Sequence, residues 1–124
     1  MKASEICIGD WFKAIDYNSP FRITAIYDDV VQTQADYQSE IDGNWYSEAE
    51  IKDLVPIELT SDILVKNGFV KTWNGDWQLK EYSTIIISKD YYVKIFERSI
   101  RIDYVHELQH LLHAACVYKE LVID

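Results

Sequence analysis

The sequence contains few residues that cross-link, stiffen or sharply bend a chain. It has two cysteines, two prolines and four glycines in 124 residues. Cys7 and Cys116 lie near opposite ends of the chain without a C-x-x-C spacing, which favours reduced, buried thiols over a disulfide, although a bond tying the two ends stays an alternative. The motifs G-x-x-x-x-G-K-[ST], G-x-G-x-x-G and G-x-S-x-G are absent. The sequence therefore gives no sign of a phosphate-binding loop or a nucleophile elbow.

Long apolar runs and excess positive charge are also missing. No run approaches the roughly 20 residues needed to span a bilayer, and the first residues lack the apolar core of a signal peptide. The net charge is −9, from 21 acidic and 12 basic residues, which disfavours binding to nucleic acid. An acidic surface suits a basic protein partner or imitation of nucleic acid. We therefore expect a cytoplasmic protein that does not bind a membrane.

The first 58 residues read as short strands and turns. Alternating apolar and polar side chains predict strands over residues 10–17 and 21–28, separated by a break at 18–20, and a third strand follows in "DDVVQTQ". Residues 35–44 are polar and predict a loop. "NWYS" and "EAEIKDLVPI" then predict a strand, a short helical turn and a closing strand. Five short strands with one helical turn indicate a small SH3-like β-barrel.

From residue 59 onward the pattern predicts an α-β-β-β-β-α module with an antiparallel sheet. Thr60 is typical of a helix start and Asn67-Gly68 of a helix stop. "WNGDW" predicts a hairpin with a type I′ turn at its Asn-Gly pair. "STIIISKD" and "YYVKIFER" predict a second strand pair, and a final helix is expected over residues 104–121, capped by Asp103. The fold class is thus α+β, with one module at 1–58 and another at 59–124.

The stretch "HELQH" in the final helix has the zinc-hydrolase spacing H-E-x-x-H. On a helix, His106 and His110 lie one turn apart and can reach one metal ion, and Glu107 between them can act as a general base. A minimal zinc-dependent hydrolase using these three residues is therefore one hypothesis.

Helix geometry argues against this hypothesis. At 100° per residue the apolar side chains form a broad stripe, and His106, His110 and His113 fall roughly opposite it, toward solvent unless another layer covers them. His113 lies too far along the axis from His106 to share an ion with it. A downstream acidic ligand could be only Glu120 or Asp124. We expect a solvated helix face with no bound metal and no cofactor, and we favour a non-enzymatic protein over an enzyme.

Two segments resemble a group of short, functionally uncharacterised proteins of gut anaerobic bacteria and their phages and mobile elements. These segments are "PIELTSDILVKNGF" at 56–69 and "YVHELQHLLHAACVYKEL" at 104–121, with "IGDWF" and "DGNWYS" as weaker similarities. In that group Gln is common at the position of Glu107 and Asn at that of His110, so the H-E-x-x-H spacing is not part of the shared pattern. The resemblance implies a small accessory protein of a phage or mobile element and no known activity.

Aromatic residues are abundant, with nine tyrosines and four tryptophans. Tyr37, Trp45 and Tyr46 flank the polar loop, where large side chains often form binding hot spots. The alternative is that Trp45 fills the small barrel. Trp73 and Trp77 flank the hairpin turn and are expected to pack across the strands.

Together these observations favour a non-enzymatic interaction protein that binds an unidentified protein partner through Tyr37, Trp45 and Tyr46. The zinc hydrolase and an acidic nucleic-acid mimic are the alternatives. Paired carboxylates elsewhere in the chain lie in polar segments and give no sign of burial. A homo-oligomer formed through an exposed strand edge is left open.

Overall fold

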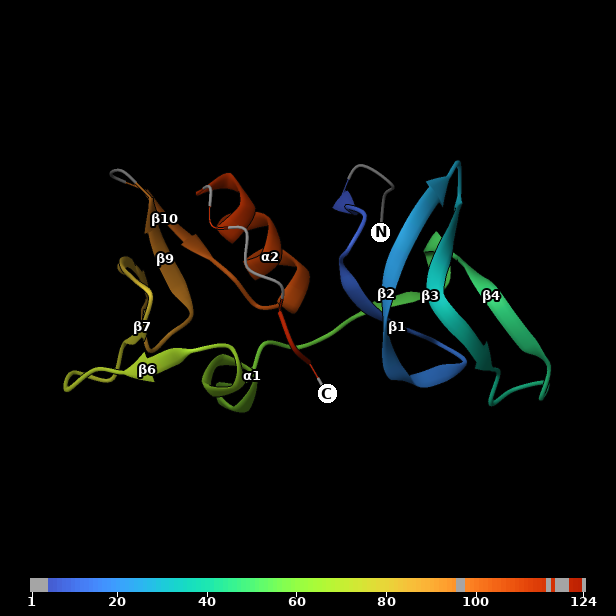
Figure 1. Ribbon diagram of the computed structural model, residues 1–124, viewed down its shortest axis with the longest axis horizontal. Coiled ribbons are helices and arrows are strands. Elements are labelled where there is room, and N and C mark those ends of the chain that lie inside the picture. Colours follow the sequence, from blue (N-terminus) through green and yellow to red (C-terminus); the bar gives the residue numbers. More distant parts are fainter. Residues whose placement is uncertain (1–4, 96–97, 116, 118–120, 124) are drawn as a thin grey trace.

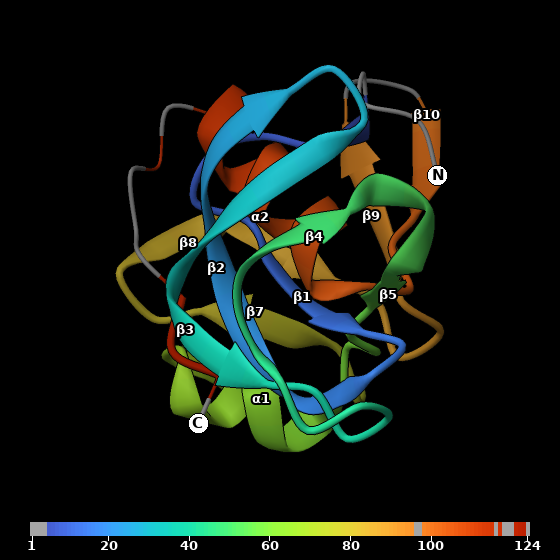
Figure 2. The ribbon, with the colours of Figure 1, turned by 90° about the vertical axis from the view of Figure 1, so that its right-hand side faces the viewer.

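The computed structural model describes residues 5–95, 98–115, 117 and 121–123. It is an α+β structure with two open antiparallel sheets and two helices (Figure 1). The two sheets lie side by side along the long axis, and the C-terminal helix α2 lies between them (Figures 1 and 2). We refer to the sheet built before residue 57 as the first half and to the remainder as the second half.

The first half is a five-stranded sheet in the order β4-β3-β2-β1-β5. Its elements are β1 (Trp11–Ala14), β2 (Tyr17–Tyr27), β3 (Val30–Gln38), β4 (Trp45–Glu50), the 3-10 turn η2 (Ile51–Asp53) and β5 (Leu54–Pro56). β5 pairs with β1, so the strand that closes the half in sequence lies beside the strand that opens it. Among the described residues no pairing joins β4 to β5, and the expected closed barrel is an open sheet.

Two boundaries in the first half differ from the sequence prediction. β2 runs through the predicted break at 18–20, where it pairs with β1 only through an irregular register between Phe12 and Ala14. β3 continues into the predicted polar loop, where Tyr37 pairs with Tyr46 and is buried. Next to Tyr37 the side chains alternate, with Asp36 and Gln38 exposed on either side of the buried ring, although the average composition of this part of the strand resembles a loop.

The second half begins with α1 (Ser61–Lys66), whose ends follow the local sequence signals. The Thr60 side chain accepts a hydrogen bond from the Ile63 amide at 3.3 Å, as an N-cap does. Asn67 closes the helix, and Gly68 follows with φ +87°, a conformation that favours glycine. The predicted start and stop of this helix are confirmed.

The second sheet has the order β10-β9-β8-β7-β6. Its strands are β6 (Phe69–Lys71), β7 (Trp77–Leu79), β8 (Tyr82–Ile87), β9 (Tyr92–Ile95) and β10 (Arg98–Arg101). The sheet therefore has five strands where four were predicted, because residues 98–101 pair with β9 rather than leading directly into the helix. The β6–β7 hairpin forms as expected, but Asn74 does not have positive φ, so its five-residue turn is not type I′.

Helix α2 spans Val105–Ala114, which is shorter than predicted. Ala115, Val117 and the described tail residues 121–123 are not helical, while Cys116 and residues 118–120 and 124 lie outside the described residues. Buried Val105, Leu108 and Leu112 pack into the core of the second half, together with Leu64, Phe69 and Leu79. A separate core fills the first half around Phe12, Phe21, Ile23 and Val31. No helix among the described residues is long and apolar enough to cross a membrane.

Candidate functional site

The residues of the H-E-x-x-H stretch have three different environments in α2. Glu107 does not face a metal position. Its Oε1 accepts hydrogen bonds from the backbone amides of Asp103 at 3.0 Å and Tyr104 at 3.1 Å. The carboxylate thus satisfies amides at the helix N-terminus, where negative charge also complements the helix dipole. The N-cap residue is Tyr104 rather than the predicted Asp103, and the geometry does not support Glu107 as a general base.

His106 is buried, with 8% of its surface exposed. Its ring lies 4.8 Å from that of Phe12 and 5.9 Å from that of Tyr104, measured between centroids. Burial lowers the pKa of His106, against the opposing charges of Asp10 and Glu107. Its Nδ1 is buried without a hydrogen-bond partner among the described residues. The prediction that the histidine face points to solvent is therefore wrong for His106, because the first half covers that side of the helix.

Gln109 forms hydrogen bonds with the first half on the side of α2 where His106 lies. Its Oε1 accepts from the Trp11 amide at 3.1 Å, and its Nε2 donates to the Gly9 carbonyl at 3.0 Å. The Trp11 indole in turn donates to the Leu121 carbonyl at 3.1 Å. Each of these bonds joins groups about a hundred residues apart in sequence, so none has a local signal. The helix consequently has two contact faces, an apolar one toward its own sheet and a polar one toward β1.

A buried carboxylate lies at this contact. Asp10 is 2% exposed, and its Oδ2 accepts from the Cys7 amide at 2.8 Å and lies 2.7 Å from His110 Nε2. The His110 side chain is about one-third exposed. One potential ligand atom from each of Cys7, Asp10 and His110 lies within 4.8 Å of the others. We call these three residues the junction cluster; His106 is not a member of it.

The junction cluster does not form a nucleophilic cysteine site. The Cys7 side chain is exposed overall, but partial desolvation, and then the negative charge of Asp10, raise the pKa of its thiol. A nucleophilic cysteine needs the opposite shift, since the thiolate is the reactive form.

The three aromatic residues predicted to bind a partner separate in the structure. Tyr37 is 4% exposed, stacks on Tyr17 and Phe21 at 4.9 and 5.7 Å, and donates to the Glu48 carbonyl at 3.2 Å. It is a core residue of the first half and does not present its ring to a partner. Trp45 is 67% exposed and so does not fill the sheet interior.

The loop between β3 and β4 presents Trp45, Tyr46 and a residue that the sequence did not single out, Ile41. Ile41 is 74% exposed and Tyr46 37%. The Tyr46 hydroxyl donates to the Asp42 carboxylate at 2.5 Å, and this bond lowers the pKa of Asp42. Asp42 also accepts from the Asn44 amide at 2.9 Å. Hydrogen bonds within the loop therefore fix the backbone from which Ile41 and Trp45 project.

A pH-dependent prediction follows from the burial of Tyr37. Burial, with smaller effects of Asp16, Tyr46 and Asp53, raises the pKa of Tyr37 to about 12 from a usual 10. Because the unfolded chain loses this proton first, stability contributed by the neutral phenol is complete below pH 10 and is lost as pH rises toward 12. Tyr37→Phe should be less stable than the wild type by about 1 kcal/mol at pH 8. Urea unfolding at pH 8 and pH 11 should show this difference shrinking or reversing; a constant difference would contradict the assignment.

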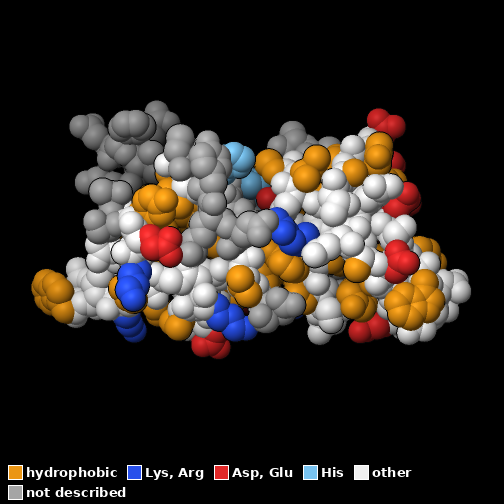
Figure 3. Space-filling model, viewed as in Figure 1, with side chains coloured by type: hydrophobic (Ala, Val, Ile, Leu, Met, Phe, Trp, Pro, Cys, Tyr) orange, Lys and Arg blue, Asp and Glu red, His pale blue; other side chains and the backbone are white. Residues whose placement is uncertain are grey.

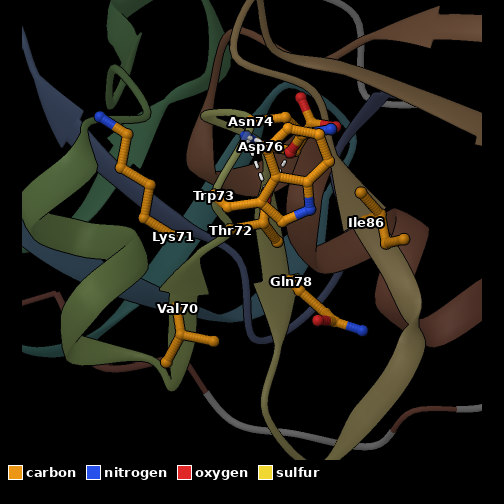
Figure 4. A pocket seen from close by; sticks show the side chains of 8 residues that line it. All are labelled: Val70, Lys71, Thr72, Trp73, Asn74, Asp76, Gln78 and Ile86. Atoms are coloured by element: carbon orange, nitrogen blue, oxygen red, sulfur yellow. Dashed lines mark hydrogen bonds between the residues drawn. The ribbon is translucent and has the colours of Figure 1, made fainter.

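The hairpin tryptophans also differ from expectation. Trp77 is buried, and the ammonium group of Lys71 lies 5.9 Å from the centroid of its ring. Trp73 lies in the β6–β7 turn and is 98% exposed, so the two do not pack across the strands. Figure 4 shows the Trp73 ring beside an open pocket on the second sheet, which is lined by Val70, Lys71, Thr72, Trp73, Asn74, Asp76, Gln78 and Ile86. The turn is held by Thr72, whose hydroxyl accepts from the Asp76 amide at 3.2 Å.

Comparison with known proteins does not identify the site. The chain has no significant match among protein-family models, curated proteins or solved structures. The function must therefore be argued from the geometry of this chain.

Proposed function

We propose that this protein is a non-enzymatic interaction protein whose β3–β4 loop binds a basic segment of a protein partner. The single observation that carries the proposal is the pair of exposed apolar side chains, Ile41 and Trp45, on a loop fixed by its own hydrogen bonds. Large side chains presented by an ordered backbone lose little conformational freedom on binding, and tryptophan is enriched at binding hot spots.

Charge around the loop indicates the chemistry of the partner. Residues 33–51 contain five carboxylates and no lysine or arginine. The five, all exposed, are Asp36, Glu40, Asp42, Glu48 and Glu50. On the described part of the face in Figure 3, hydrophobic and acidic side chains cover the end formed by β3 and β4, while lysine and arginine side chains lie farther along the molecule. A basic segment with apolar side chains complements such a surface.

As part of this proposal, we relate the first half to small SH3-like folds, and its strand order supports this. The order β4-β3-β2-β1-β5, with a 3-10 turn between β4 and β5, resembles that of small SH3-like barrels, although the sheet is open. Such folds often bind peptides through loop-borne aromatic residues, which is an argument from fold analogy. Origin in a phage or mobile element, as the sequence resemblance implies, remains part of the proposal.

The test is binding of short fluorescent peptides in which lysine or arginine alternates with leucine, phenylalanine or proline. Trp45→Ala should weaken binding by at least about 30-fold, the loss typical of a hot spot. Trp73→Ala is the matched control, since it removes an even more exposed tryptophan from the other half and should leave affinity unchanged. Binding should also weaken as salt rises from 50 to 500 mM, because salt screens the attraction between exposed charges on the loop and on the peptide.

The same experiment separates this proposal from a nucleic-acid mimic. A mimic would attract basic peptides through carboxylates alone, so Trp45→Ala would have no effect while Glu40→Gln and Asp42→Asn would weaken binding. If the peptides bind wild type and Trp45→Ala equally, the proposed contact surface is wrong.

A further inference from the structure

The junction cluster contains three different metal-ligand types in one place. Cys7 supplies a sulfur, Asp10 a carboxylate oxygen and His110 an imidazole nitrogen, all within 4.8 Å of one another. Zn²⁺ and similar dications bind mixed sets of sulfur, nitrogen and oxygen ligands, commonly with four positions around the ion. This combination is more selective than a group of surface carboxylates, which would favour Mg²⁺ or Ca²⁺.

The distances require only a small adjustment for an ion to enter. Metal–ligand bonds of about 2.0–2.3 Å place ligand atoms of a tetrahedral site about 3.2–3.8 Å apart. Asp10 Oδ2 and His110 Nε2, now 2.7 Å apart, would separate by about 0.6 Å, and the separations from the sulfur, none above 4.8 Å, would close by about 1 Å at most. Cys7 is exposed and His110 partly so, which leaves a path for the ion from solvent.

Neighbouring groups hold two of the three ligands in place. The Cys7 amide donates to Asp10 Oδ2, so the backbone at Cys7 and the carboxylate are already joined. The His110 ring meets the ring of buried His106 edge-on at a centroid distance of 5.7 Å. Ligands oriented before the metal arrives lose less freedom on binding, as they do in protein metal sites generally.

The position of the cluster gives an ion a definite structural effect. Cys7 and Asp10 precede β1 in the first half, whereas His110 belongs to α2 in the second. Figure 3 shows histidine side chains reaching the surface where the two halves meet. An ion bound by all three residues would join the halves directly, and binding that requires the folded arrangement stabilises it.

From this geometry we propose that Cys7, Asp10 and His110 bind one Zn²⁺-class dication at the contact between the two halves. The site uses a ligand set different from that of the H-E-x-x-H hypothesis, with His110 as the shared member. It does not depend on the proposed peptide surface, which lies at the far end of the first half (Figure 1).

The test is titration of the tag-free, reduced full chain with Co²⁺ and Zn²⁺, followed by absorption spectroscopy, elemental analysis and thermal unfolding. We expect one Co²⁺ per chain with a sulfur-to-cobalt charge-transfer band, displaced by Zn²⁺, and a Tm that rises with metal concentration. Cys7→Ser should abolish the band, and His110→Asn should weaken Co²⁺ binding by at least about 100-fold, more than loss of an outer-shell partner does.

Matched controls keep the result interpretable. His113→Asn makes the same change on an exposed residue of the same helix, and Cys116→Ser removes the other cysteine; both should retain the band and the affinity. Cys7→Ser alters an exposed side chain, so it should keep the unfolding transition of the metal-free wild type. Absence of Co²⁺ binding, or a band that survives Cys7→Ser or disappears in Cys116→Ser, would overturn the proposal.

Discussion

Phe12→Ala is expected to lower the free energy of unfolding by about 3–5 kcal/mol, the range for removing a fully buried aromatic ring. Phe12 is completely buried in the first core, and its ring also packs on His106 of α2. The cavity would therefore open at the point where the two halves meet. Chemical denaturation followed by tryptophan fluorescence and by circular dichroism measures the loss.

The same experiment tests whether the two halves unfold together. If they do, both signals should shift to the same lower midpoint in Phe12→Ala. Ile15→Ala, only three residues farther along and 68% exposed, should change stability by less than about 0.5 kcal/mol. Two separate transitions, with only one of them moved by Phe12→Ala, would show that contact between the halves contributes little.

Asn67→Ala is expected to cost about 2–3 kcal/mol, because a single buried amide makes three hydrogen bonds. Its Nδ2 donates to the carbonyls of Ile63 and Val122, both at 2.8 Å, and its Oδ1 accepts from the Val122 amide at 2.6 Å. The side chain thus closes α1 and holds the tail at residue 122 against it. Alanine would remove all three bonds and leave backbone groups without these partners.

Asn67→Asp distinguishes the donor bonds from the acceptor bond. Aspartate can still accept from the Val122 amide, but it cannot donate to either carbonyl and would place a buried charge against both, so its stability should lie at or below that of Asn67→Ala. Asn18→Ala, at an exposed position in β2, should stay within about 0.5 kcal/mol of wild type in the same urea titration. If Asn67→Ala left the free energy of unfolding unchanged, water would replace these hydrogen bonds without cost.

Features governed by neighbouring residues could be predicted from the sequence. The Thr60 cap, the Asn67-Gly68 stop and the antiparallel β6–β7 pair depend on groups within a few residues, and the structure has them. The extension of β3 through polar residues was missed because pairing with β4, and not local composition, determines that strand. Features that depend on residues close in sequence were predicted, and features that depend on contacts between distant segments were not.

The candidate sites depend even more on contacts between distant segments, which the sequence pattern does not reveal. A helical projection places His106 correctly opposite Leu108, but it cannot show that Phe12 lies beyond it. Asp10 was predicted only to begin a strand, and nothing in its spacing links it to His110 a hundred residues later. For Trp45 the sequence left two alternatives, a contact residue or a side chain filling the barrel, and the structure shows it exposed. Burial of Tyr37 depends on Tyr17 and Phe21, which lie in another strand.

The bonds that join Gly9 and Trp11 to Gln109 and Leu121 also bear on synthesis of the chain. At about 5–20 residues per second, a ribosome needs roughly 5–20 s between making Trp11 and making its partners. During that interval the polar and aromatic side of β1 has no helix to cover it. Docking of the helix must then be a late step in folding, and the emerging N-terminal sheet presents a transient surface on which chaperones can act.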